Sequence, residues 1–350
     1  MSRHFKKIKN ILFYPKKETN EIIDKINSFK GETGFAIYNP ECLGIMNSTK
    51  DLFKNTLALK EVLNKKQIDT IVDAIINSNV KYVVFSSITF GWKGIAEKLK
   101  EKNNVIKIKF LWHGSHAMFV ERDESYFLYS ILELMDRGIV DSIGFFKESM
   151  ANFYKEKGYN SFFVTNNVKD IKVTNHNAFN KEDGKVYIGS YAAGDRWGKN
   201  TANQLSAASM IKNSVLDIIP VTPLISEFCE TLNITINDKN IGYLKRQDLL
   251  NRMALNDVNL YVTFTECSPV IPLESLELGV PCITGNNHSY FKNSQLEEYL
   301  VVKSEDNIDE IYSKIKYAIK NKEEIIKLYK EWKKNYNVYA SELFNNFIND

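Results

Sequence analysis

The sequence has few of the features that disulfide frameworks, metal sites and membrane spans require. It contains four cysteines in 350 residues, and none of them forms a Cys-x-x-Cys pair. A disulfide framework and a clustered metal site are therefore not expected. No apolar run is long enough to cross a bilayer, and the first residues lack the apolar core of a signal peptide. Together these absences predict a cytoplasmic protein.

An excess of charge of one sign is also absent. The chain has 46 Lys and Arg against 43 Asp and Glu, a net charge of +3, which is too small to indicate a nucleic-acid partner. Basic residues nevertheless gather before the first acid, Glu18, around an expected strand at residues 11–14. They form either a solvated edge or a patch for peripheral contact with the inner membrane face, where each cation adds roughly 1 kcal/mol.

What the chain does contain is a regular alternation of strand-like and helix-like stretches without hairpin signals. This alternation predicts an α/β protein with parallel sheets, and the length favours two domains. The polar, non-periodic residues 169–184 are the predicted linker. They separate a first domain, 1–168, from a second, 185–320, and a helical segment, 321–350, follows. An irregular region is expected around residues 42–47.

The stretch from residue 260 to residue 285 has the clearest local pattern. An apolar run at 260–264 is typical of a buried strand, and a turn follows it. Pro272 suits the first turn of a short helix, and Gly279 is placed to cap its end. A second apolar run at 280–283 completes a strand, loop, helix and strand, which is the order of elements in a parallel sheet.

Two carboxylates in this stretch face the same edge of the predicted sheet. Glu266 ends a strand and Glu274 begins a helix, and ligands of open α/β sheets bind at the carboxyl ends of the strands. Backbone amides at a helix start suit a phosphate. A carboxylate one turn further in can accept hydrogen bonds from two hydroxyls, as on a ribose or a hexose.

The spacing of the two glutamates resembles that of a known enzyme family. Seven residues separate Glu266 from Glu274, and the run ESLELGVPCIT begins at the second glutamate. This pattern resembles the retaining glycosyltransferases of the GT-B type, in particular family 4. The resemblance implies two Rossmann-like domains that face each other across a cleft, with a C-terminal helix that crosses back to the N-terminal domain. It assigns acceptor binding to the first domain and nucleotide-sugar binding to the second.

The loop between the glutamates departs from the family pattern. Cys267, Ser268 and Pro269 stand in place of the family's usual Gly-Phe-Gly. Pro269 has no N–H to offer a phosphate. The implied contacts to the donor therefore fall to Ser268, Val270 and Ile271.

An earlier loop, 191–200, carries the cations that the resemblance requires. The family holds the donor's diphosphate with an Arg after the preceding strand and a Lys before the next helix. Lys199 matches the Lys, whereas Ser190 replaces the Arg, and Arg196 is either its substitute or a solvated partner of its acidic neighbour. Fixed cations stabilise the charge that a diphosphate gains as the sugar departs. Leu244, in a Gly-x-Leu turn, is implied to contact the nucleobase, although it also suits a core position.

A histidine is expected at the same sheet edge of the first domain. The strand at 105–112 runs into the sequence His113-Gly-Ser-His116. Histidine hydrogen-bonds in both protonation states and titrates near neutrality. His113 resembles the active-site histidine of the family, which lies near the transferred sugar. His116 is interpreted as a loop residue with a backbone partner.

The resemblance implies a hexosyltransferase that moves a sugar from a nucleotide-sugar donor, a UDP-sugar first of all, to a saccharide, lipid-linked or protein acceptor. His113 and Glu266 are the implied catalytic residues, and Glu274 is the implied ribose ligand. No Asp-x-Asp motif is present, and no metal or other cofactor is expected, as is usual for GT-B enzymes.

Three other functions fit parts of the sequence. A sugar-nucleotide 2-epimerase of the same fold would also use carboxylates and histidines in its crevice, and a test for epimerisation of free UDP-sugar separates it from a transferase. A non-catalytic, glycosyltransferase-like partner subunit fits the departures at 15–17, 190 and 267–269, and nucleotide binding by the isolated chain tests it. A two-domain solute-binding protein would be expected to carry a signal peptide.

Overall fold

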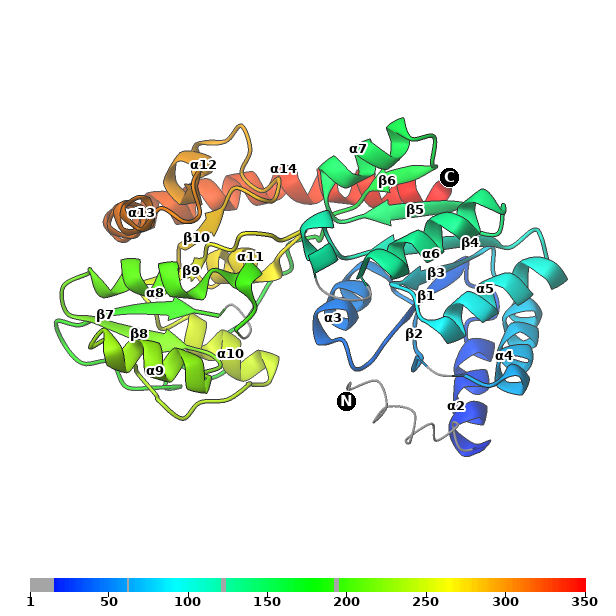
Figure 1. The fold of residues 1–350 in the computed structure, drawn as a ribbon, viewed down its shortest axis with the longest axis horizontal. Coiled ribbons are helices and arrows are strands. Elements are labelled where there is room, and N and C mark those ends of the chain that lie inside the picture. The colour runs from blue at the N-terminus through cyan, green and yellow to red at the C-terminus, as the bar shows by residue number, and fades with distance from the viewer. Residues whose placement is uncertain (1–15, 62, 121–123, 192–194) are drawn as a thin grey trace. The chain divides into compact units, whose positions relative to one another are not determined.

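The computed structural model describes residues 16–61, 63–120, 124–191 and 195–350. Contacts divide the chain into two compact units, which we call unit 1 and unit 2 (Figure 1). Unit 1 comprises Met1–Asn166 and Ala340–Asp350, and unit 2 comprises Asn167–Tyr339. The strand expected at residues 11–14 and the basic residues before it lie outside the described residues, whereas Lys16 and Lys17 begin a helix. The membrane contact inferred from these residues stays a prediction.

Unit 1 is built on a parallel sheet with the strand order β2-β1-β3-β4-β5-β6. Its strands are β1 (Gly34–Tyr38), β2 (Thr56–Ala58), β3 (Tyr82–Ser86), β4 (Lys107–Trp112), β5 (Ser142–Phe145) and β6 (Ser161–Phe163). Its helices are α2 (Lys16–Asn27), α3 (Leu43–Leu52), α4 (Lys65–Ser78), α5 (Phe90–Lys102), the 3-10 helix η1 (His116–Val120), α6 (Glu124–Asp136) and α7 (Glu148–Glu156).

The helices of unit 1 begin where the sequence supplies caps. Asn64 and Gln67 form a reciprocal capping box at the start of α4, and the Thr89 hydroxyl accepts from the Trp92 amide at the start of α5. The inner strands are buried on both faces, as an apolar run such as that in β3 predicts. Helix α3 occupies residues 43–52, so the prediction of an irregular region at 42–47 is wrong.

A lysine lies in the core of unit 1. The side chain of Lys109, on β4, is fully buried. Its ammonium donates to the Ser142 hydroxyl at 3.1 Å and to the Phe347 carbonyl at 3.0 Å, and it lies 3.6 Å from the Asp350 carboxylate. Burial lowers the pKa of Lys109. Residues 340–350 therefore supply the acceptors that a charge inside this unit requires.

Unit 2 is built on a second parallel sheet with the strand order β11-β10-β9-β7-β8. Its strands are β7 (Val186–Ser190), β8 (Ser214–Ile218), β9 (Val258–Tyr261), β10 (Cys282–Gly285) and β11 (Val301–Val302). Its helices are the 3-10 helix η2 (Trp197–Lys199), α8 (Thr201–Ser209), α9 (Pro223–Thr231), α10 (Arg246–Met253), α11 (Val270–Glu277), α12 (Gln295–Leu300) and α13 (Ile308–Lys320). The chain leaves β7 toward β8 and later returns to its other side with β9. The carboxyl ends of β7 and β9 are therefore the switch point at which such sheets bind ligands.

A single long helix ends the chain. Helix α14 (Lys322–Asn349) has 28 residues and follows α13 after a break at Asn321. It begins within unit 2, and its last residues belong to unit 1, so the predicted helix that crosses back to the N-terminal domain is confirmed. Two parallel sheets in two Rossmann-like units also confirm the predicted α/β class. Within the described ranges, no helix is both long and apolar enough to cross a bilayer.

Candidate functional site

The glutamates of unit 2 stand on the predicted strand, loop and helix. Strand β9 ends at Tyr261, three residues before the end of the predicted run, because the Phe264 amide leaves the ladder and donates to the Gly198 carbonyl at 2.9 Å. Helix α11 begins at Val270, with Pro272 in its first turn as predicted. Gly279 follows with φ of +80°, a conformation that favours glycine as a helix cap.

Glu266 and Lys199 form an ion pair at the carboxyl end of β9. The Tyr261 hydroxyl donates to the same carboxylate at 2.9 Å, and the Lys199 ammonium donates to the Tyr261 hydroxyl at 3.2 Å. The side chains of Lys199 and Glu266 are 10% and 18% exposed, so both charges lie in a sheltered place and keep a face toward solvent. Tyr261 is a member of this cluster that the sequence analysis did not single out.

The surroundings keep the Tyr261 hydroxyl protonated. Burial, followed by the nearby charge of Glu266, raises its pKa well above the usual range. The charge of Arg196 opposes this rise. The hydroxyl therefore stays a hydrogen-bond donor to Glu266 throughout the neutral range.

Local hydrogen bonds fix the position of Lys199. The residue ends the 3-10 helix η2, and Asn200 follows in the left-handed conformation with φ of +53°. The side-chain amide of Asn200 donates to the carbonyl of Val262, the residue just after β9, at 3.0 Å. Gln204 donates to the Lys199 carbonyl at 2.8 Å and accepts from the Val262 amide at 2.9 Å. The loop that carries the cations is therefore tied to the strand that carries Glu266.

Glu274 lies deeper and has its own cation. It is buried on α11, and Arg246 at the start of α10 approaches its carboxylate to 2.5 Å. Nearby, Leu244 packs against the cluster that contains Tyr191 and Ile219. Leu244, the predicted base contact, thus lies two residues before Arg246, which pairs with the predicted ribose ligand Glu274. Arg246 was not among the predicted site residues.

The first turn of α11 carries the remaining predicted donor contacts. Ser268 shares a hydrogen bond of 2.7 Å with the Tyr290 hydroxyl. Pro269 is the N-cap and makes no side-chain capping bond, and Val270 and Ile271 begin the helix. Amides of a first helical turn have no intrahelical acceptor, so Val270 and Ile271 have the backbone position that an anion requires.

A buried polar network joins the strands and helices around the switch point. Asp217 on β8 forms an ion pair with Arg252 of α10, and both side chains are buried. The Tyr191 hydroxyl, just after β7, donates to Asp217 at 2.7 Å. Asn259 of β9 donates to the Ser275 hydroxyl of α11 at 2.8 Å. Directional bonds therefore join the strands and helices that carry the site.

In unit 1, His113 ends a chain of hydroxyl groups. Its Nε2 lies 2.7 Å from the Ser86 hydroxyl at the end of β3, and Ser86 lies 2.6 Å from the Thr49 hydroxyl on α3. Thr49 donates its proton to the Ile45 carbonyl at 2.7 Å. Ser86 must then donate to Thr49, and the proton between Ser86 and His113 belongs to Nε2. This arrangement assigns the Nε2–H tautomer and leaves the lone pair on Nδ1.

The imidazole of His113 is neutral in the physiological range. The residue is half-buried, and its ring centroid lies 4.5 Å from that of Phe146. This burial lowers the pKa of His113 to about 3. His116, which was expected to have a backbone partner, instead shares a hydrogen bond of 2.9 Å with the Tyr154 hydroxyl.

Within each unit, the structure brings some of the predicted residues together. In unit 2, Lys199 and Glu266 form an ion pair, and the charge of Arg196 acts on the neighbouring Tyr261 hydroxyl. A second small group joins Glu274 to Arg246, and His113 stands in the other unit. No group of three or more His, Cys, Asp or Glu placed to hold a metal ion occurs in the described part of the chain.

Comparisons with known proteins place the fold. No family model matches the sequence, and no curated protein matches it either. Among solved structures, a trehalose-6-phosphate synthase, OtsA, is similar with a TM-score of 0.61 and 10% identity over 90% of this chain and 99% of that one. A UDP-forming α,α-trehalose-phosphate synthase of Burkholderia xenovorans gives a TM-score of 0.58 and 10% identity over 90% and 98%.

A third similar structure is a variant of S. aureus TarM in complex with fondaparinux, α-GlcNAc-glycerol and UDP. Its TM-score is 0.58 at 12% identity, and the likeness covers 81% of this chain and 59% of that one. At such identities the likeness shows the fold alone. The chain therefore has the two-domain GT-B fold.

Proposed function

We propose that this protein is a retaining, metal-independent glycosyltransferase of the family 4 kind. It moves a hexose from a nucleotide sugar to a hydroxyl of a saccharide, lipid-linked or protein acceptor. The observation that carries the proposal is the cluster of Lys199, Glu266 and Tyr261 at the switch point of unit 2. UDP-sugar is the first donor to consider, because solved structures of this fold include a UDP-forming enzyme and one that holds UDP.

The charges of unit 2 suit the parts of a nucleotide sugar. Lys199 and Arg196 are the cations for the diphosphate, with the first-turn amides of Val270 and Ile271 beside them. Buried Glu274 accepts the ribose hydroxyls. Leu244, packed next to Tyr191, is the apolar contact for the base, and Ser268 is the remaining polar donor contact.

The proposed step exchanges one bond at the anomeric carbon. The bond from the carbon to the phosphate oxygen breaks, and a bond to the acceptor oxygen forms on the same face of the sugar. The acceptor proton passes to the leaving phosphate oxygen, and the nucleoside diphosphate departs. Lys199 stabilises the charge that gathers on the leaving group, and Glu266 stabilises the positive charge that develops on the ring. His113, neutral and with a lone pair on Nδ1, accepts a hydrogen bond from a sugar hydroxyl.

The ion pair between Lys199 and Glu266 bears on how a diphosphate would bind. The carboxylate neutralises the lysine that the diphosphate needs. A bound diphosphate replaces or shares this partner. Glu266 is then released from the cation and keeps its hydrogen bond from Tyr261, which increases its effect on a developing positive charge.

The experiment that tests the proposal is a thermal-shift screen of the full chain against UDP, GDP, ADP, CMP and common UDP-sugars. A ligand at 100 times its Kd adds about 2.7 kcal/mol to the free energy of unfolding. One nucleotide is expected to raise the Tm of the wild type, and Lys199→Ala and Glu274→Ala are expected to lose that response. Lys239→Ala, at an exposed pair with Glu230, is the matched control and keeps it.

Each other result leads to a different conclusion. No shift of the wild type with any nucleotide contradicts the donor site and favours the non-catalytic partner subunit. A shift with UDP-sugar, together with conversion of free UDP-sugar to its 2-epimer, favours the epimerase. A shift that both Lys199→Ala and Glu274→Ala retain places the nucleotide elsewhere on the chain.

A further inference from the structure

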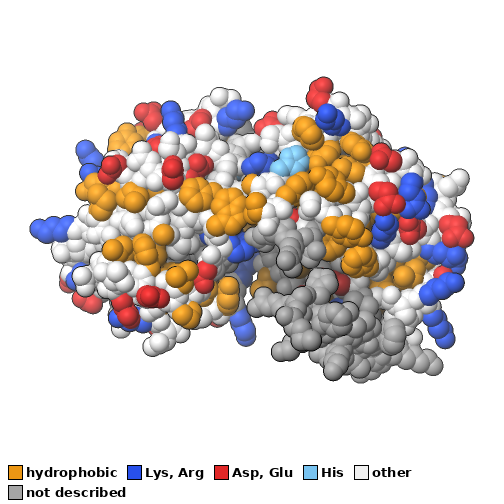
Figure 2. Space-filling model, in the orientation of Figure 1, with side chains coloured by type: hydrophobic (Ala, Val, Ile, Leu, Met, Phe, Trp, Pro, Cys, Tyr) orange, Lys and Arg blue, Asp and Glu red, His pale blue; other side chains and the backbone are white. Residues whose placement is uncertain are grey.

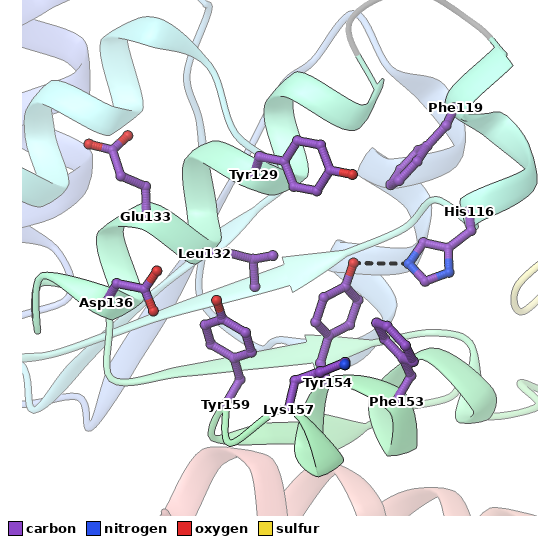
Figure 3. A pocket seen from close by; sticks show the side chains of 10 residues that line it. All are labelled: His116, Phe119, Tyr129, Leu132, Glu133, Asp136, Phe153, Tyr154, Lys157 and Tyr159. Atoms are coloured by element: carbon purple, nitrogen blue, oxygen red, sulfur yellow. Dashed lines mark hydrogen bonds between the residues drawn. The ribbon is translucent and has the colours of Figure 1, made fainter.

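A groove lies between α6 and α7 of unit 1 and includes His116 and Tyr154 in its lining. It encloses about 740 Å³, within the range of pockets that bind small ligands. One wall comes from α6, the other from α7 and the turn after it, and η1 closes one end (Figure 3). Hydrophobic side chains gather on the surface of this unit (Figure 2).

The lining of the groove is a continuous series of aromatic rings. Neighbouring ring centroids in the series are between 5.0 and 6.0 Å apart, which is the spacing of favourable aromatic pairs. The series runs Tyr129, Phe119, His116, Phe153, Tyr154 and Tyr159. Tyr129 and Phe153 are 57% and 46% exposed, so broad ring surfaces face the solvent from opposite walls.

Polar groups also line the groove, between and on the rings. The Tyr154 hydroxyl bonds to His116 at 2.9 Å. Burial, followed by the nearby charge of Asp136, raises the pKa of the Tyr159 hydroxyl. Glu133 completes the rim and is held there by Lys93 at 2.7 Å. Figure 3 shows carboxylates at one end of the groove and the imidazole at the other. An occupant therefore meets flat apolar surfaces and hydrogen-bonding groups side by side.

This combination of rings and polar groups fits a carbohydrate better than a wholly apolar or an anionic ligand. A pyranose ring has one face of C–H groups, which packs on aromatic rings, and a rim of hydroxyls, which bond to carboxylates and tyrosines. A wholly apolar occupant would remove Asp136 and the tyrosine hydroxyls from water without compensation, which is costly. An anionic occupant would meet two carboxylates, Glu133 and Asp136, against the single ammonium of Lys157.

The end of the groove at His116 lies three residues after His113. We propose that the α6–α7 groove binds an oligosaccharide, as the part of the acceptor chain that extends away from the hydroxyl to be glycosylated. The assignment of that oligosaccharide to the acceptor rests on the proposed function; the binding of carbohydrate by the groove does not. The acceptor class is accordingly a saccharide of several units rather than a single sugar.

Saturation-transfer NMR on the full chain tests this binding without nucleotide. The probes are cellopentaose, maltopentaose, chitopentaose, mannopentaose and xylopentaose, each at about 5 mM, where Kd values near 1 mM are still detected. At least one pentasaccharide is expected to bind the wild type. Tyr129→Ala and Phe153→Ala are each expected to weaken that binding about ten-fold or more. Tyr126→Ala is the matched control, since Tyr126 lies on the same helix, is 50% exposed and is not part of the groove.

Two results overturn the proposal. One is the absence of a signal from every pentasaccharide, and the other is a signal that Tyr129→Ala and Phe153→Ala both leave unchanged. The nucleotide screen is independent of this measurement. If the wild type responds to a nucleotide but binds no pentasaccharide, the proposed transferase function stands and the proposed binding of oligosaccharide by the groove is refuted. If the wild type binds a pentasaccharide through Tyr129 and Phe153 but responds to no nucleotide, the groove proposal stands and the transferase proposal is refuted.

Discussion

The two sheet edges of this protein carry different kinds of polar chemistry. In unit 2, the carboxyl ends of the strands hold charges in pairs, Lys199 with Glu266 and Arg246 with Glu274. In unit 1, the corresponding edge holds His113 at the end of a chain of hydroxyls. Burial lowers the pKa of that histidine to about 3, so the whole arrangement is uncharged.

The difference suits two kinds of ligand. Paired charges that can exchange partners suit an anionic leaving group, because the cation is already fixed and needs no reorganisation. An uncharged histidine with an assigned tautomer suits a neutral hydroxyl, because it supplies one acceptor in one direction and attracts no anion. Each of the following variants changes one of these two edges.

Replacement of Lys199 by Ala is expected to have the largest effect. Loss of a fixed group that stabilises leaving-group charge lowers kcat/KM by about 10²- to 10³-fold. The measurement is steady-state transfer from the nucleotide sugar identified by the screen, with Lys239→Ala as the control. A value within about three-fold of the wild type would mean that the charged edge does not bear the leaving group.

Glu266→Gln is expected to raise the affinity for the nucleotide and to lower the turnover. Without its carboxylate partner, Lys199 is available to the diphosphate, so the Kd of the nucleotide falls by about ten-fold, or roughly 1.4 kcal/mol. Turnover falls by about 10²-fold, because the positive charge on the sugar loses its stabiliser. Calorimetry measures nucleotide binding, and the transfer assay measures turnover. Weaker nucleotide binding by Glu266→Gln than by the wild type would contradict the proposal that the diphosphate takes the place of Glu266 at Lys199.

The neutral edge predicts a pH dependence of stability. Folded His113 has a pKa of about 3, whereas the unfolded chain binds the same proton near pH 6.5. The stability from this residue is therefore complete above pH 6.5 and decreases as the pH falls toward 3, by up to about 2 kcal/mol between pH 7.5 and pH 5. Urea unfolding of the wild type and His113→Gln at both pH values measures it, and equal losses in the two proteins would refute it.

Ser86→Ala is expected to have the smallest effect. Ser86 is a positioning residue, and loss of its hydrogen bond costs about 1 kcal/mol, or roughly five-fold in kcat/KM. Nitrogen-15 shifts of the His113 ring are the decisive measurement, because the variant should admit the Nδ1–H tautomer. Ser78→Ala, which removes another buried hydroxyl from unit 1, should leave those shifts unchanged, and unchanged shifts in Ser86→Ala would contradict the assignment.

Local patterns were sufficient to predict much of the fold. The strand, loop, helix and strand around α11 depend on apolar runs bounded by Pro272 and Gly279, and such signals act within a few residues. Helix α3 was missed for an equally local reason. Its buried residues include Ser48 and Thr49, so the side that faces the protein is polar, and hydrophobic periodicity cannot detect it.

The site was predictable residue by residue but not as a set of contacts. Lys199 and Glu266 are 67 positions apart, and their pairing depends on how loop 191–200 is tied to β9. Arg246 is adjacent to an ordinary helix start in the sequence, and nothing local indicates that it reaches Glu274. Ser86 had a usable signal, because its strand neighbours that of His113 in a parallel sheet. The roles of these residues stay predictions until the variants are measured.

The acceptors of buried Lys109 have a consequence for biosynthesis. Its ammonium binds the Phe347 carbonyl and lies near Asp350, and these residues are translated only after the whole of unit 2. While the ribosome is still making unit 2, the emerging first unit has a lysine without two of its native partners. We therefore expect unit 1 to mature after translation of residue 350, and chains released before residue 340 to be substrates for chaperones and proteases. Early recognition of incomplete chains is thus built into the order of synthesis.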